Sequence, residues 1–257
     1  MHNKLRSIPL LLSILIIFIT GCSPADEKPV EIKPIPPMYS YIVGSWNIPE
    51  DQWEVKKDQA ETAKKILDQA IDNDTIVAYG YDKSPLHDTF WLAMSIEALH
   101  KVRVQFEKIG LTPPLSNPDT AMPSVHILVS RYFNWKTIRV ENAYVHVGVY
   151  KIRPDAPADA IDQLSQYFFG PVLEKALIDG LIFEWETDTY ADPEDSPGTF
   201  LIAYLSEKSE DLETVKKAVQ KRLETPLADG PKLASLIDMK GIIDVDVRSY
   251  ARYKKTK

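Results

Sequence analysis

Hydrophobic and polar positions follow two periods along this chain, and the periods change in the same order twice. Apolar residues that recur every three or four positions predict amphipathic helices, whereas runs rich in β-branched and aromatic residues predict strands. In the first half, the strand-like runs lie at 41–48, 75–81, 89–94 and 125–135, and the helical spacings lie at 51–71 and 95–109. The first half therefore has the order strand, helix, strand, strand, helix, strand.

The second half repeats this order. Strand-like runs lie at 146–152, 181–186, 199–204 and 243–253, and helical spacings lie at about 158–178 and from Ser209 onward. Gly170-Pro171 is expected to bend or break the first of these helices, because proline lacks a backbone donor. The pair Val43-Gly44 near the start of the first half matches Val147-Gly148 in the second. We interpret the two halves as an internal duplication; the alternative is a chance similarity of two α+β segments.

The N-terminal region has the pattern of an export signal. Lys4 and Arg6 precede an apolar run at 8–19, which is shorter than the roughly twenty residues that a membrane-spanning helix needs. The run ends in Ile19-Thr20-Gly21-Cys22, which resembles the lipobox of bacterial lipoproteins. The resemblance implies cleavage before Cys22 and acylation of its thiol. An ordinary secretory signal with an incidental cysteine is the alternative.

This resemblance also implies a location. A lipid on Cys22 would anchor the protein in the cell envelope, and Ser23 after it favours the outer membrane, facing the periplasm, in a Gram-negative cell. Residues 22–38 contain five prolines among charged residues and predict an extended tether. The expected organisation is a signal peptide at 1–21, a lipidated tether at 22–38 and two repeats at 39–137 and 143–257.

Composition excludes some classes of function. The net charge is -7 and the pI is about 5.3, so a general nucleic-acid-binding role, which needs clustered Lys and Arg, is not expected. Cys22 is the single cysteine, so no internal disulfide can form and cysteine-based catalysis is excluded if the thiol is acylated. With 44% hydrophobic residues, the chain can bury a core of its own.

The strand and helix order within each half is that of the ferredoxin-like βαββαβ unit. One face of such a sheet is covered by helices, and the other can be covered by packing two units sheet to sheet. The fold class expected here is therefore α+β, with two repeats closed on each other, which resembles the dimeric α+β barrel superfamily in a tandem form. That superfamily includes small monooxygenases, haem-handling enzymes and stress-response proteins, so the resemblance leaves the function open.

Strand alternation places three candidate ligand-binding residues between the two sheets. Trp46 on the first strand, and His146 and Tyr150 on its counterpart in the second half, are expected to face this space. His146 could be a general base or a haem ligand. The alternative is a hydrogen-bonded core histidine without a role in binding.

Glu184 and Glu186 are a further candidate pair. They alternate with apolar residues, so both carboxylates are expected on one strand face, about 7 Å apart. Such a pair can share a proton or bind a hard cation. The alternative is a solvated face of an edge strand, where charge deters unwanted pairing.

No motif in the sequence assigns a reaction. The loop residues Asp192, Glu194 and Asp195 lack the spacing of a calcium loop, so no metal site, cofactor or catalytic residue is predicted. The function favoured is an envelope lipoprotein that binds a small apolar or aromatic ligand, or a protein partner, without catalysis. The alternatives are an oxygenase-like or haem-using enzyme of the α+β barrel type and a structural envelope component.

Overall fold

The fold is described from a computed structural model for residues 38–46, 53–83, 87–108, 122–136, 139–192, 194 and 196–255. The expected signal peptide, Cys22 and the tether lie outside these residues. The first repeat consists of β1 (Met38–Trp46), α1 (Trp53–Asp72), β2 (Ala78–Lys83), β3 (His87–Met94), α2 (Ile96–Lys108) and β4 (Met122–Trp135). This is the predicted order of strands and helices.

The second repeat has the same order with a more elaborate first helix. Its elements are β5 (Arg139–Ile152), α3 (Ala160–Gln163), the π-helix η2 (Leu164–Phe169), α4 (Gly170–Asp179), β6 (Glu184–Tyr190), β7 (Thr199–Ser206), α5 (Ser209–Glu224), α6 (Leu233–Leu236) and β8 (Ile237–Tyr253). Of the bend or break expected at Gly170-Pro171, a break is not found, since the helical segments follow one another without a gap. The π-helix η2 ends at Phe169, and α4 continues directly from it with Pro171 in its first turn.

The eight strands form one closed antiparallel barrel in the order β1-β3-β2-β8-β5-β7-β6-β4. Each repeat contributes four neighbouring strands, in the ferredoxin-like order β4-β1-β3-β2 and β8-β5-β7-β6. The repeats join at two seams, where β2 pairs with β8 and β4 pairs with β6. The predicted intrachain α+β barrel is therefore confirmed.

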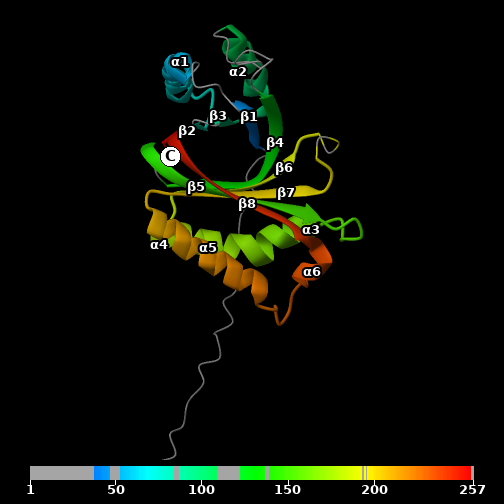
Figure 1. Cartoon of the computed structure of the whole chain (residues 1–257). Helices are drawn as coiled ribbons and strands as arrows, with labels where there is room; N and C mark the ends of the chain where they lie inside the picture. The colour runs from blue at the N-terminus through cyan, green and yellow to red at the C-terminus, as the bar shows by residue number, and fades with distance from the viewer. Residues whose placement is uncertain are drawn as a thin grey trace, which may run out of the picture.

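The helices cover the outside of the barrel in two groups. Figure 1 shows α1 and α2 together on one side of the strands and α3, α4, α5 and α6 on the opposite side. Each group buries an apolar stripe against its own sheet, as in Ala63 and Leu67 of α1, which pack with Tyr79 and Leu92 of the sheet. None of the helices in the described residues has the length and apolar character needed to cross a membrane.

The seam between β2 and β8 is tied to α1 by polar contacts. Arg252 on β8 forms ion pairs with Asp68 and Asp72 of α1, the latter at 2.7 Å. Tyr79 on β2 donates a hydrogen bond to Asp68 at 2.7 Å, and burial raises the pKa of its phenol. The last strand of the second repeat is therefore held by the first repeat.

Candidate functional site

The inner face of β6 carries a row of three carboxylates. Trp185 and Thr187 point outward, since Trp185 bonds to Glu174 of α4. The alternate residues Glu184, Glu186 and Asp188 therefore point into the barrel. Glu184 and Asp188 are 1% and 2% exposed, and Glu186 is partly buried.

The carboxylates have hydroxyl partners from three other strands. The hydroxyl of Tyr253 on β8 donates to Oε2 of Glu184 at 3.2 Å. Ser40 on β1 and Ser130 on β4 lie 3.3 Å apart between their hydroxyls, and both hydrogen-bond to Glu186, while Ser130 also bonds to Asp188. One strand therefore supplies the acids, and its neighbours around the barrel supply neutral donors.

These partners leave part of each carboxylate without a hydrogen bond. Oε1 of Glu184, Oε2 of Glu186 and Oδ1 of Asp188 are all buried and unbonded. Within the described residues, no lysine, arginine or histidine forms an ion pair with any of the three. A buried charge without a counter-charge is costly, so such groups either hold protons or pair with something that enters.

Burial raises the pKa values of the three carboxylic acids. It raises the pKa of Asp188 to about 7, against the opposing hydrogen bond from Ser130. Burial also raises the pKa of Glu184 and of Glu186 well above the usual range, and the neighbouring carboxylates raise both further. The three carboxyls therefore hold their protons to higher pH than exposed carboxyls do, and they can donate protons or accept them.

Aromatic rings surround the Glu184 end of the row. Tyr253 lies between the rings of Trp91, Trp135 and Phe183, at centroid distances of 6.1, 6.2 and 5.9 Å. Phe133, whose backbone is paired with that of Glu186, lies 5.2 Å from Trp135. The inner face of the barrel thus combines acids with π surfaces.

The structure corrects the sequence-based interpretation of this row in two respects. Glu184 and Glu186 do share one face, but that face is the interior of the barrel and not a solvated edge, because β6 is paired on both sides, with β4 and β7. Sequence reasoning also missed Asp188. Its signal was the continued alternation Glu184-Trp185-Glu186-Thr187-Asp188, which runs past the predicted end of the strand at residue 186.

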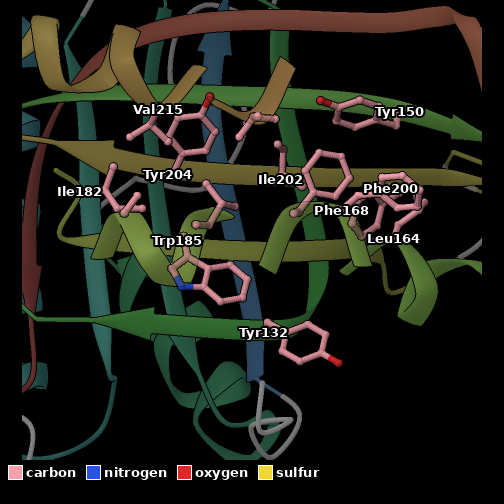
Figure 2. Close-up of a cluster of buried hydrophobic side chains, with 14 of the residues drawn as sticks. Tyr132, Tyr150, Leu164, Phe168, Ile182, Trp185, Phe200, Ile202, Tyr204 and Val215 are labelled. Atoms are coloured by element: carbon pink, nitrogen blue, oxygen red, sulfur yellow. The ribbon is translucent and has the colours of Figure 1, made fainter. Parts of the chain in front are cut away.

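The expectation that His146 and Tyr150 face the space between the sheets is wrong. Tyr150 packs against Phe169 of the π-helix at 5.0 Å, and His146 lies 4.9 Å from the ring of Tyr204 on the helix-covered side. Figure 2 shows Tyr150 and Tyr204 within the buried cluster that also contains Phe168 and Trp185. The inner face of β5 is instead formed by residues such as Val145 and Val147.

A shift of one residue explains this error. Gly148 pairs with Ile202, whose side chain is in the helix-side cluster, and a Cβ on Gly148 would meet Ile202 at 3.0 Å. Gly44 instead pairs with Thr89, on the inner register of β3. Aligning the two Val-Gly pairs therefore matches the inner face of β1 with the helix-covered face of β5. A shift of one residue moves every side chain of a strand to the other face of the sheet. Trp46 ends β1, and its side chain lies outside the described residues.

His146 is held in a surface network. Its Nδ1 lies 2.7 Å from Asp246, its Nε2 lies 3.4 Å from Asp244, and Lys216 of α5 donates to Asp246 at 2.7 Å. Both ring nitrogens thus face carboxylates, and neither is directed at an open site. The geometry fits a structural histidine and does not fit a haem ligand.

We predict that His146→Leu lowers the free energy of unfolding by about 1 kcal/mol, the usual cost of one lost hydrogen bond. Urea denaturation at neutral pH would measure this, with Lys216→Met as a control for the same network. Any small molecule that copurifies with the protein should remain bound in the variant. Its loss would contradict the placement of His146 outside the barrel.

The acidic loop does not form a second site. Asp192 accepts a hydrogen bond from the backbone of Glu194 at 2.9 Å, an ordinary loop contact. Among the residues that the structure describes, no group of three or more His, Cys, Asp or Glu side chains is arranged to hold a metal ion.

Comparisons with known proteins identify the fold and no family. No family model matches the sequence, and no curated protein does. A "putative monooxygenase" from Lactobacillus acidophilus NCFM is similar in structure, with 11% identity, a TM-score of 0.58, and coverage of 84% of this chain and 97% of that one. A second protein of that description, from Fusobacterium nucleatum subsp. nucleatum ATCC 25586, gives 9% identity, a TM-score of 0.56, and coverage of 86% and 96%.

Proposed function

We propose that this chain is a lipid-anchored envelope protein whose barrel binds a small ligand between the two repeats. The observation that carries the proposal is the row Glu184, Glu186 and Asp188, in which each carboxylate has a buried oxygen that is free to accept a hydrogen bond. A barrel of eight strands is just wide enough to be filled by side chains or to hold one small molecule. Buried polar atoms without partners are unusual in a core that has only a structural role.

Mass spectrometry of the full chain tests the ligand-binding part. The protein would be purified in detergent and denatured, and the released small molecules would be compared with those from a Glu186→Gln, Asp188→Asn variant. Enrichment of one compound in the wild-type extract is expected. Equal extracts, together with full retention of the fold in both proteins, would favour a structural envelope component instead.

The lipid anchor is tested separately. In cells given labelled palmitate, Cys22→Ser should abolish labelling and move the protein from the membrane fraction to the soluble fraction. The reason is that two or three acyl chains hold a protein at a bilayer stably, whereas the tether alone has no apolar anchor. Ser23→Ala is the matched control, and it should remain labelled. Labelling of the Cys22→Ser variant would contradict the proposal that the protein is a lipoprotein.

A second candidate is an oxygenase that acts on the bound ligand. Two observations favour it: the fold is shared over nearly the whole length with two bacterial proteins named as monooxygenases, and Asp188 has a pKa of about 7, which suits a proton acceptor near neutral pH. Oxygen consumption by the full chain, measured with the extracted compound, would test this. Consumption that is lost in Asp188→Asn would favour the enzyme over the binding protein.

A further inference from the structure

The chemistry inside the barrel specifies a class of ligand. Three acids stand on one strand, and the groups that contact them are the neutral hydroxyls of Ser40, Ser130 and Tyr253. An anionic ligand would add to the negative charge. A neutral ligand would leave the acids either protonated or without a counter-charge. A cation would supply the positive counter-charge that the described residues do not provide for these carboxylates.

The aromatic rings near the carboxylates favour an organic cation over a metal ion as the ligand. The faces of Trp and Tyr attract ammonium groups through the ring quadrupole, and aromatic cages beside acids bind alkylated amines in this way. Trp91, Trp135 and Tyr253 lie at the Glu184 end of the row, where Tyr253 already bonds to Glu184. A bare metal ion would gain little from such rings, and the described residues hold no preformed metal site.

Small residues line other parts of the inner face. Ala78, Ala93, Ala143 and Ala251 are all fully buried on the inner side of four different strands. At Gly80 an added Cβ would lie 2.0 Å from the indole of Trp91, so the ring rests directly on the backbone of β2. Large rings and small side chains therefore alternate on the inner faces of β3 and β8, with Trp91 next to Ala93 and Tyr253 next to Ala251.

We propose that the barrel interior binds a small organic amine, whose ammonium group pairs with Glu186 and Asp188 and whose apolar part contacts the rings around Tyr253. This inference rests on the proposed function, because it names the ligand of the same site. The free oxygens of Glu186 and Asp188 accept hydrogen bonds from the ammonium group. Glu184, which Tyr253 already contacts, lies at the junction of the acidic and aromatic parts.

Pairs of matched compounds provide the test. The full chain in detergent would be titrated by calorimetry at pH 8 with dimethylaminoethanol, butylamine and tryptamine, and with the neutral isosteres 3-methylbutanol, butanol and tryptophol. We expect at least one amine to bind, with its isostere weaker by about thirtyfold or more, the scale of losing one partner of a buried charge pair. The Glu186→Gln, Asp188→Asn variant should lose that preference, and Asp192→Asn, on the exposed loop, should keep it.

The possible outcomes separate the two proposals. If an isostere binds as tightly as its amine, or if the neutralised variant binds the amine unchanged, the amine assignment is overturned and the binding function remains. If none of the six compounds binds but the wild-type extract is enriched in a neutral or acidic compound, the amine assignment again fails alone. If nothing binds and the extracts are equal, both proposals fail. Since the acid-to-amide changes remove buried charge, thermal unfolding of the variant shows whether it is folded.

Discussion

Asp188→Asn is expected to stabilise the protein by roughly 4 kcal/mol at pH 8 relative to its effect at pH 4. The carboxyl has its usual pKa in the unfolded chain, whereas burial raises the pKa to about 7 in the folded protein. Between these values the folded state holds the extra proton, so its stability falls as the pH rises through this window. An amide cannot ionise, and the variant avoids that loss.

Urea denaturation of both proteins at a series of pH values from 4 to 8 would measure the difference. The gap between the two curves should open as the pH rises toward about 7 and stay constant above it. Asp192→Asn, which removes an exposed carboxylate, should track the wild type across the series. A gap that does not change with pH would show that Asp188 has an ordinary pKa and is not enclosed by the barrel.

Trp185→Ala should destabilise the fold by about 3–5 kcal/mol, the usual cost of removing a large buried aromatic residue. Trp185 is 0% exposed and stacks with Tyr132 at 6.1 Å. Figure 2 shows both rings at the edge of the helix-side cluster of the second repeat. The indole also donates to Glu174 at 3.0 Å, and this donor would be lost with the ring.

Urea denaturation followed by far-ultraviolet circular dichroism suits this variant, because the change removes a fluorophore. Trp185→Phe keeps most of the volume and should cost less than half as much. Ile178→Ala, at a position that is 62% exposed, should change stability by less than about 0.5 kcal/mol. Equal losses for Trp185→Ala and Ile178→Ala would contradict the packing of α4 on the barrel.

The sequence predicts the architecture well because the hydrophobic period is local information. Helices such as α5 are marked by apolar residues, Leu212, Val215 and Val219, on one face, and the structure buries all three. The pairing of β2 with β8, in contrast, joins residues that lie far apart in the sequence. It depends on two unit sheets having complementary edges, which the order of elements suggests only through the resemblance to a known class of barrel.

The candidate site was harder to predict, because alternation shows which residues share a face and not which face is inside. Glu184 and Glu186 were placed together correctly, but the sequence left a solvated edge strand open as the alternative, since charge is usually solvated. His146 and Tyr150 were placed inside because a Val-Gly pair was aligned one residue out of step. Contacts from distant strands, such as that from Tyr253 to Glu184, decide these questions.

The two seams of the barrel also have a consequence for how the protein is made. The edge of β2 is completed by β8, and the contact between Tyr79 and Tyr250 joins residues that are 171 positions apart. During synthesis, the first repeat therefore has an unpaired strand edge, of the kind that promotes association with other chains. A chaperone, or delayed collapse of the nascent chain, would protect that edge until the final strand is made.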